Sequence, residues 1–451
     1  MEKKDYLSKI EDLTSEQIAE GISGGIVTFD ELKKTGEFGH DKQKSVNTLL
    51  KKIDDDTFAA ADTVSAMRKY LLVFPAGNHV IEVQEKIQQI QDKENAEERR
   101  RQEREKMLRE IKEDINEYDT DDIIRKFSSE VLDDLCNQLG IDAQMIKNYK
   151  EPVLKFNDIP KIESDIPEGY TDVFFWGIPS SGKTCALSAI FSTIKKDYSM
   201  EAPDCDKKFG ATYRDSLINI FLNGYGYLPG RTNMDRTQYM PFLFYQRGEK
   251  NKRKISFFEL SGEVFKYFYE VANNIQIIND FNREDIEKSF QTLELLLKSN
   301  NQKIHFFFID YNQETKHTTD INGLTQSNYL EAAATYFRDA KDKDNKPVDI
   351  FKKKTDAVYV VVTKSDEIRD HDRSVSAKLF LNDNFGSFMD VLKNQCNKHS
   401  VDFKVKLFSI GDVYFKKICK INRVYSTDII NDLLKRIKPV SDNKYRKFFN
   451  S

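Results

Sequence analysis

Short runs of continuous apolar residues recur through the last two-thirds of the chain, and stretches with helical spacing separate them. Runs of this length and composition predict strands that are buried on both faces of a sheet. The predicted strands cover residues 172–176, 240–246, 254–260, 304–310, 357–363 and 403–409. The predicted helices cover residues 185–191, 264–272, 281–297, 327–338, 375–397 and 427–437. This alternation predicts an α/β fold with a mostly parallel sheet, helices on both faces, and any ligand at the carboxyl ends of the strands.

Two departures from simple alternation are expected within this region. Only the charged turn 248–253 separates the strands at 240–246 and 254–260, so these two strands are predicted to form an antiparallel hairpin. Residues 195–228 contain three glycines and little periodicity, which predicts an irregular loop.

The N-terminal third shows helical spacing without strand-like runs, and it predicts an all-α region. Capping boxes at residues 14–17 and 28–31 mark helix starts within a helical module at 1–82. A charged connecting helix and then a short helical element are predicted within residues 83–150. Three prolines make residues 151–169 an extended linker, and residues 170–451 form the α/β domain.

The charged helix predicted at 84–116 leaves two interpretations open. Charges of both signs recur at i, i+4 spacing, which supports an exposed helix, and apolar positions are too sparse for a long two-stranded coiled coil. The helix is either a rod that binds a partner or a solvated connection. In both interpretations the helical N-terminal region is the expected contact surface for protein partners.

Overall charge and cysteine usage exclude several classes of function. Charged residues make up 32% of the 451 residues, but 70 Lys and Arg nearly cancel 74 Asp and Glu, so the net charge of -4 gives no case for nucleic-acid binding. Five dispersed cysteines without CxxC spacing favour a reducing compartment. We find no secretion signal and no run of 18 apolar residues, so a cytoplasmic location without a transmembrane segment is expected.

The strand predicted at 172–176 runs into Gly177-Ile-Pro-Ser180-Ser181-Gly182-Lys183-Thr184-Cys185, which fits the pattern GxxxxGK[ST] and leads into a helix. Two glycines let backbone N–H groups turn inward at a helix N-terminus, where the peptide dipoles favour an anion. Lys183 is then expected to reach the β- and γ-phosphates of a nucleotide, and the Thr184 hydroxyl to bind Mg²⁺. The other predicted nucleotide contacts of this loop are Gly177, Ser180, Ser181, Gly182 and Cys185.

The strand predicted at 254–260 ends in the sequence Glu259-Leu-Ser-Gly262-Glu263. An acidic side chain at this place can hold an Mg²⁺-bound water. The Gly262 N–H can meet the γ-phosphate, and a side chain at this position would obstruct that approach. Taken alone, the same residues also fit an ordinary turn after a core strand.

Two further strand ends are suited to a guanine base. The strand at 357–363 ends in Thr363-Lys364-Ser-Asp366, where a carboxylate can accept hydrogen bonds from guanine N1–H and its exocyclic amine. The Lys364 stem can lie along the base. The strand at 403–409 ends in Ser409-Ile410-Gly, whose backbone amides can close over the guanine oxygen. Adenine lacks the donor pair that Asp366 would accept, so such a site would reject it strongly.

Together, the ordered motifs GIPSSGKT, ELSGE, TKSD and FSIGD resemble those of P-loop GTPases of the translation-factor and Ras-related class. The resemblance covers about residues 170–438 and none of the N-terminal region. The segment around residues 228–263 is also similar to bacterial double-GTPase-like proteins that are linked to conflict systems. The resemblance implies a domain that binds GTP or GDP with Mg²⁺.

Residue by residue, the resemblance implies phosphate binding by the loop, with Mg²⁺ on Thr184 and Glu259. It also implies that Thr232 covers Mg²⁺ and the γ-phosphate, with Thr237 as the alternative. The departures are Glu259 where Asp is usual, Thr363 where Asn is commoner, and Glu263 where many relatives carry a water-orienting Gln. The residues implied in catalysis are Lys183, Thr232, Gly262 and Glu263.

Three functions are compatible with these motifs. The first is a switch that binds GTP and hydrolyses it slowly, because a carboxylate at Glu263 would repel the γ-phosphate unless protonated or bridged. Arg231, Arg236 or a partner's arginine would then stabilise the developing charge. The second is a scaffold that binds the nucleotide without hydrolysing it. The third is an ATPase whose acidic strand ends at Asp310, which would leave the TKSD motif unexplained.

Overall fold

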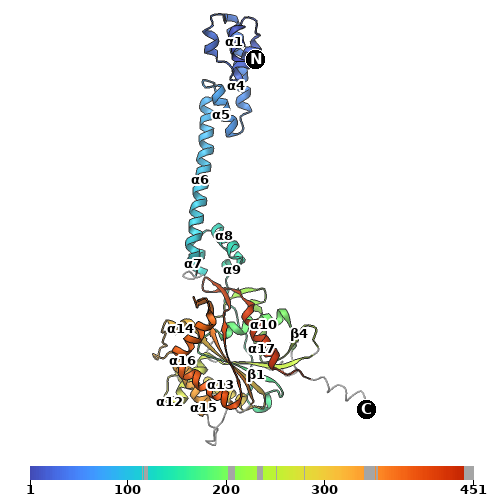
Figure 1. The fold of residues 1–451 in the computed structure, drawn as a ribbon, viewed down its shortest axis with the longest axis vertical. Coiled ribbons are helices and arrows are strands. Elements are labelled where there is room, and N and C mark those ends of the chain that lie inside the picture. The colour runs from blue at the N-terminus through green and yellow to red at the C-terminus, as the bar shows by residue number, and fades with distance from the viewer. Residues whose placement is uncertain are drawn as a thin grey trace, which may run out of the picture. The chain divides into compact units, whose positions relative to one another are not determined.

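The computed structural model describes residues 1–113, 115, 120–201, 209–230, 237–249, 251–278, 280–339, 351 and 354–440, with only the backbone at 120 and 280–282. The chain divides into two compact units, Met1–Glu113 and Asp114–Ser451. Figure 1 labels the elements of both units.

The first unit is built from helices alone among its described residues. Both predicted capping boxes are present, with Thr14 accepting from the Gln17 N–H and Thr28 from the Glu31 N–H. The first four helices enclose a small apolar core that includes Ile18. The helices are α1 (Lys3–Ser8), α2 (Ser15–Ser23), α3 (Phe29–Lys33), α4 (His40–Ala59), α5 (Val64–Val73) and α6 (Val80–Glu113).

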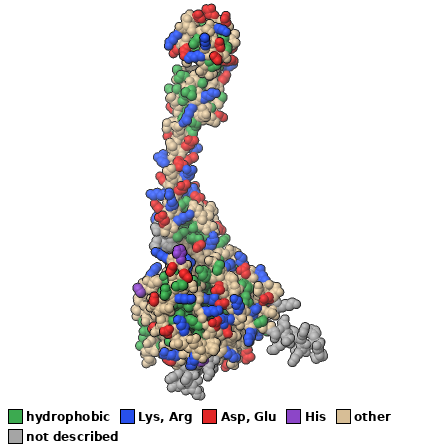
Figure 2. All heavy atoms as spheres, viewed as in Figure 1, with side chains coloured by type: hydrophobic (Ala, Val, Ile, Leu, Met, Phe, Trp, Pro, Cys, Tyr) green, Lys and Arg blue, Asp and Glu red, His purple; other side chains and the backbone are tan. Residues whose placement is uncertain are grey.

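Helix α6 is the long charged helix that the sequence predicts. Of its 34 residues only Val83, Leu108 and Ile111 are buried. Ion pairs one turn apart, such as Lys86 with Glu82, lie along its surface. Figure 2 shows acidic and basic side chains interspersed along this part of the chain. The helix is therefore stabilised by local pairs more than by packing of an apolar face.

The second unit begins with three short helices, α7 (Thr120–Lys126), α8 (Ser129–Leu139) and α9 (Ala143–Lys147). Ser128 separates α7 from α8. The Ser128 hydroxyl accepts from the Val131 N–H and starts α8 anew, as a serine N-cap does. Gly140 ends α8 in the left-handed conformation, as glycine often does after a helix.

Seven of the described strands form one sheet in the order β2-β4-β5-β1-β6-β7-β8. The pairs β5-β1, β1-β6, β6-β7 and β7-β8 are parallel, while β2-β4 and β4-β5 are antiparallel. The predicted α/β fold with a mostly parallel sheet is confirmed, and so is the β4–β5 hairpin. The strands are β1 (Thr171–Trp176), β2 (Tyr198–Glu201), β4 (Gln238–Gln246), β5 (Arg253–Glu259), β6 (Gln302–Asp310), β7 (Thr355–Thr363) and β8 (Asp402–Phe408).

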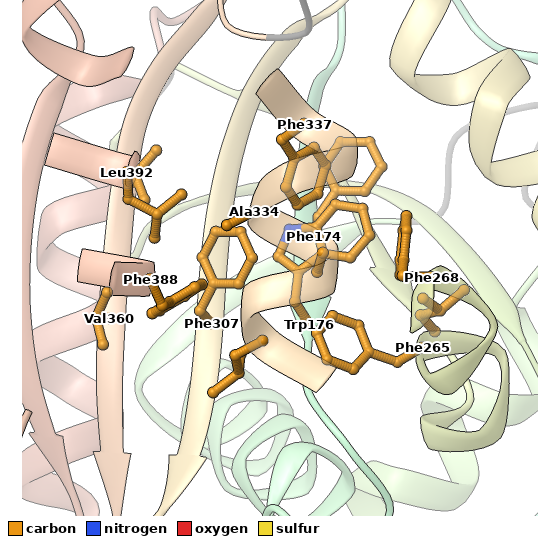
Figure 3. Packing of buried hydrophobic residues seen from close by; sticks show 14 of the residues in the cluster. Phe174, Trp176, Phe265, Phe268, Phe307, Ala334, Phe337, Val360, Phe388 and Leu392 are labelled. Atoms are coloured by element: carbon orange, nitrogen blue, oxygen red, sulfur yellow. The ribbon is translucent and has the colours of Figure 1, made fainter. Parts of the chain in front are cut away.

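Helices cover both faces of this sheet, as Figure 1 shows. Alternate strand residues point to opposite faces, so Trp176 and Phe175 belong to different cores. Around Trp176, aromatic rings of several elements pack edge to face, among them Phe268 and Phe337 (Figure 3). On this face lie α12 (Gly262–Asn273), α13 (Asp280–Lys298), α15 (Gln326–Asp339) and α16 (Arg373–His399); on the other lie α10 (Lys183–Asp197), α11 (Ala211–Phe221) and α17 (Arg423–Arg436).

The prediction of an irregular loop over 195–228 is wrong. The described part of this segment holds β2, helix α11 and strand β3 (Tyr225–Tyr227). Strand β3 pairs with β10 (Ile418–Ile421), which pairs with β9 (Gly411–Tyr414), and together they form a small antiparallel sheet. Strands of three or four residues are too short to show a period, and pairing across distant segments decides them.

Candidate functional site

The loop 177–182 lies between the carboxyl end of β1 and the start of α10, as the sequence predicts. Gly177 has φ 146°, a conformation that L side chains rarely adopt. A Cβ at this position would also lie 2.8 Å from the Phe308 carbonyl oxygen. The loop and the first residues of α10 line a cavity of about 580 Å³, and the first N–H groups of a helix have no partner within the helix itself.

Lys183 is the first residue of α10 and its side chain bends back over the loop. Its Nζ donates to the Gly177 oxygen at 2.7 Å and to the Ile178 oxygen at 2.9 Å. Only 6% of the residue is exposed, and this burial lowers the pKa of the ammonium to about 8. The group is thus a buried cation held by neutral carbonyls, for which a phosphate would be a stronger acceptor.

Thr184 and Glu259 meet although 75 residues separate them in the chain. The Thr184 Oγ1 donates to Glu259 Oε1 at 2.5 Å. Parallel pairing places Glu259 opposite Phe175 at the end of β1, which brings the two side chains to one edge of the sheet. Burial raises the pKa of the Glu259 carboxyl above its usual range.

The Thr184–Glu259 pair fits a magnesium ion. A hydroxyl and a carboxylate are hard oxygen donors, and Mg²⁺ is often held by one or two such groups together with phosphates and waters. Among the described residues no group of three or more His, Cys, Asp and Glu could hold a metal. The pair therefore suits an ion that arrives with a phosphate ligand better than a permanent metal site.

The segment after Glu259 lies directly against the phosphate loop. A Cβ at Gly262 would fall 2.2 Å from the Pro179 nitrogen, so only glycine fits there. The next residue, Glu263, is ion-paired with Lys266 at 3.6 Å, and Lys266 also contacts Asp320 at 2.9 Å. The carboxylate of Glu263 is thus bridged by a cation.

Of the two threonines considered for Mg²⁺, only Thr237 lies within the described residues. It is buried at the start of β4, where its Oγ1 accepts from the Ser261 N–H at 3.5 Å. Thr232, Arg231 and Arg236 lie outside the described residues. The choice between Thr232 and Thr237 therefore stays a prediction.

The end of β7, which is predicted to bind the guanine base, contacts the phosphate loop. The Thr363 Oγ1 donates to the Ser181 carbonyl oxygen at 3.0 Å. Lys364 has a left-handed backbone, and its Nζ donates to Asp310 Oδ2 at 2.7 Å. Asp366 is exposed and lines a cavity together with Ser409 and Gly411 at the end of β8. The backbone carbonyl of the intervening Ile410 accepts from the Asn422 N–H at 2.8 Å.

Asp310, the acidic residue of the ATPase interpretation, has a structural role. Its Oδ1 accepts from the N–H groups of Asn312 and Gln313, as the N-cap of α14 (Tyr311–Thr315). Its Oδ2 binds Lys364. The Thr184 hydroxyl donates instead to Glu259, so the geometry favours Glu259 as the acidic partner of the loop.

Sequence reasoning missed one wall of the loop cavity. It is formed by the segment after α9 and by the β9–β10 hairpin, where Lys417 lies over the Tyr149 ring at 4.6 Å. Tyr149 also packs edge to face against Tyr227 of β3. No local pattern marks these residues, because pairing of β10 with β3 and β9 places them. The wall consists of Tyr149, Glu151, Lys416 and Lys417, and Leu228, Pro229 and Gly230 line the cavity beside it.

Cys185 also lines the loop cavity, beside Thr184. Burial raises the pKa of its thiol to about 12, so the side chain stays neutral. The stronger donor that this position offers to an anion is its backbone N–H, because a neutral thiol is only a weak donor.

Comparison with known proteins finds no family model and no curated protein that match the chain. Among solved structures, the Saccharomyces cerevisiae Ski7 GTPase-like domain is similar in two forms, one bound to GDP and inorganic phosphate and one bound to GTP. The identities are 14% and 13%, the aligned part covers 54% of this chain and 44% of each Ski7 chain, and both TM-scores are 0.26. A score this low supports no inference about function.

No helix in the described part of the chain is both long enough and apolar enough to cross a membrane.

Proposed function

We propose that this protein binds GTP and GDP with Mg²⁺, hydrolyses GTP slowly and acts as a molecular switch. The observation that carries the proposal is that the strand end of Thr363 and Asp366 is bonded to the phosphate loop. A loop suited to phosphates and a carboxylate suited to guanine then belong to one site.

In this proposal the loop amides and Lys183 bind the phosphates, with Gly177, Gly182 and the serines shaping the cradle. Thr184 and Glu259 would hold Mg²⁺, because these two oxygen donors already lie together beside the loop. Mg²⁺ would neutralise charge on the β- and γ-phosphates. Thr232 or Thr237 would cover Mg²⁺ and the γ-phosphate in the GTP form.

Specificity for guanine would come from Asp366. Its carboxylate is exposed beside the cavity at the ends of β7 and β8, where it can accept from guanine N1–H and the exocyclic amine. Backbone amides of Ser409 and Ile410 would meet the guanine oxygen. Thr363 would take the place of the commoner Asn by bonding to the loop through its hydroxyl.

The switch part of the proposal concerns the segments next to the γ-phosphate and the helical N-terminal unit. Gly262 touches the loop, so a γ-phosphate that draws in its N–H would move the start of α12. The N-terminal helices would present protein-binding surfaces whose docking depends on the nucleotide. Similarity of residues 228–263 to bacterial double-GTPase-like proteins would place such a switch in a conflict system.

The test is calorimetric titration of the full chain with GDP, GTP and ATP in the presence of Mg²⁺. We expect GTP to bind at least about a hundredfold more tightly than ATP, because ATP would leave Asp366 without its donors. Asp366→Ala should remove this preference, while Glu367→Ala, an exposed acid on the same turn, should keep it. Lys183→Ala should abolish binding and Lys195→Ala should not. Equal ATP and GTP affinities in the parent protein would defeat the guanine assignment.

The second candidate is a scaffold that binds GTP without hydrolysing it. Its support is Glu263, whose carboxylate stands where a water-orienting amide is common in the GTPases that the motifs resemble. Phosphate release measured with and without candidate partners distinguishes the two. Release that stays at background with every partner favours the scaffold, and release stimulated by a partner favours the switch.

A further inference from the structure

Tyr213 lies on α11, outside every motif, and it contacts the acidic residue of the loop. Its hydroxyl donates to Glu259 Oε2 at 2.6 Å, and the tyrosine is completely buried. The other oxygen of the same carboxylate accepts from Thr184. Both oxygens of Glu259 are therefore fixed by hydroxyl groups from two different helices.

The two hydroxyls would respond differently to a magnesium ion. Thr184 would turn its oxygen toward the metal, while Tyr213 faces the far oxygen and would keep its hydrogen bond. A phenol hydroxyl keeps its proton at neutral pH and donates it to the carboxylate. If Thr184 turns toward Mg²⁺, Tyr213 keeps its hydrogen bond to Glu259 and continues to fix the orientation of the carboxylate.

Tyr213 is itself held by the linker that precedes β1. The Phe156 ring stacks on the Tyr213 ring with centroids 5.2 Å apart. The Asn157 Oδ1 accepts from the Tyr213 N–H at 3.0 Å. We call residues 154–158 the linker strap.

The Asn157 side chain replaces a missing helix cap. The N-cap position of α11 is Gly210, which has no side chain to accept from the first N–H groups. A Cβ at Gly210 would lie 2.3 Å from the Tyr239 oxygen, so no capping side chain fits there. Asn157 supplies the acceptor from 56 residues away, and α11 starts where the strap holds it.

A second connection runs from the strap to the strand that pairs with Glu259. The Gln238 side chain accepts from the Asn157 backbone N–H at 3.0 Å and donates to the Asn157 backbone carbonyl oxygen at 3.1 Å. Gln238 is the residue of β4 that lies opposite Glu259 on β5. The strap is thus bonded both to the helix that carries Tyr213 and to the strand that pairs with Glu259.

We propose that Tyr213 is a positioning residue for the Mg²⁺-binding carboxylate Glu259, and that the linker strap sets its position through Phe156 and Asn157. The inference rests on the proposed function, since it assigns Glu259 to Mg²⁺. It makes the linker a point at which a change in the segment before β1 alters how tightly Mg²⁺ and nucleotide are held.

The experiment titrates Mg²⁺ against the full chain with a fluorescent GDP analogue, in the parent protein and in Tyr213→Phe. The phenylalanine keeps the ring that stacks on Phe156 and removes only the hydroxyl. We expect the Mg²⁺ concentration for half-maximal tightening of GDP to rise about tenfold, because a hydrogen bond to a charged group is lost. GDP affinity in EDTA should stay unchanged. The matched control is Tyr336→Phe, which loses a hydroxyl bond to Glu294 at 3.0 Å away from the loop and should behave as the parent.

A second pair of variants tests the strap. Asn157→Ala removes the acceptor for the Tyr213 N–H and should shift the Mg²⁺ midpoint in the same direction by about threefold. Asn157→Asp keeps an acceptor and should return the midpoint to the parent value. This pair decides the question even where Tyr213→Phe fails to fold.

The outcomes separate the inference from the proposed function. Equal Mg²⁺ midpoints for the parent, Tyr213→Phe and Asn157→Ala would overturn the inference while leaving GDP binding in place. A parent protein that binds no GDP, or whose GDP affinity ignores Mg²⁺, would overturn the proposed function and with it the inference. A shift in Tyr336→Phe as large as that in Tyr213→Phe would show a general packing effect and would also overturn it.

Discussion

The Thr363 hydroxyl donates to the Ser181 carbonyl oxygen at 3.0 Å, with the Ile309 oxygen 3.2 Å away as a second acceptor. Strand β7 does not neighbour β1, because β6 lies between them. One side chain therefore ties the phosphate loop to the ends of two other strands. In the proposed site, this bond fixes the distance between the phosphate end and the guanine end of the nucleotide.

Removing this hydroxyl should weaken binding of every guanine nucleotide. Thr363→Val keeps the shape of the side chain but leaves the buried Ser181 oxygen without its donor, at a cost of about 1–3 kcal/mol. We expect GDP and GTP affinities to fall together by about tenfold, with the preference over ATP kept. Titration calorimetry measures this, and Thr363→Ser, which keeps the hydroxyl, is the control. A loss confined to the GTP-over-ATP preference would contradict the role in joining the two ends.

The close approach of Gly262 to Pro179 predicts a severe effect of one methyl group. Gly262→Ala would place a carbon 2.2 Å from the Pro179 nitrogen, so the loop or α12 must shift. We expect the free energy of unfolding to fall by about 1–3 kcal/mol, which is the usual cost of adding atoms to a tightly packed site. GTP should lose more affinity than GDP, because the displaced segment faces the γ-phosphate.

The control is Gly386→Ala within α16, where an added Cβ meets nothing within 4 Å. This change should leave stability equal to or above that of the parent, since alanine favours a helix. Chemical denaturation measures both variants. Equal stability of Gly262→Ala and Gly386→Ala would refute the steric role of Gly262.

The lowered pKa of Lys183 predicts that nucleotide affinity depends on pH. Only the protonated ammonium pairs with phosphate, and its pKa in the free protein is about 8. Binding strength is therefore nearly full below about pH 7 and is lost as the pH rises through about 8. Between pH 7.0 and 8.5 the GDP affinity should fall about fourfold, and at pH 8.5 binding should take up about three-quarters of a proton.

Calorimetry in buffers of different ionisation enthalpy measures this proton uptake. An affinity that stays constant from pH 7.0 to 8.5, with no proton taken up, would mean that Lys183 is already charged in the free protein.

The carboxylate of Glu263 predicts slow hydrolysis by the isolated protein. Its ion pair with Lys266 offsets part of the repulsion from a γ-phosphate, but a carboxylate lacks the N–H donor with which an amide orients the attacking water. Single-turnover assays of the parent should show slow phosphate release, and Glu263→Gln should raise the rate by up to about tenfold. Glu287→Gln, a partly exposed ion-paired glutamate on α13, is the control. Fast release by the parent alone would contradict this assignment.

Much of the fold could be predicted because its signals are local. The apolar runs of β1, β6 and β7 and the helical spacing between them follow from burial on both faces of a sheet. The capping boxes of α2 and α3 are also local, since each needs only two residues three positions apart. The loop 177–182 is a local signal as well, because the positive φ angles of its own backbone require its glycines.

Helix α11 shows where such reasoning stops. Its N-cap is a glycine, and its cap comes from Asn157, so the start signal is absent from the neighbouring sequence. The small sheet of β3, β9 and β10 was missed for a similar reason, since each strand is four residues or fewer and depends on its partners.

Local patterns were enough to predict the α/β layering, the phosphate loop and the candidate residues at the strand ends, because burial, period and turn chemistry act over a few neighbouring residues. The hydrogen bonds from Thr363 to the loop, from Thr184 to Glu259 and from Tyr213 to Glu259 were found in the folded structure and could not be predicted. These are hydrogen bonds between segments 46 or more residues apart. Their geometry is set by strand register and helix packing, which no local pattern encodes.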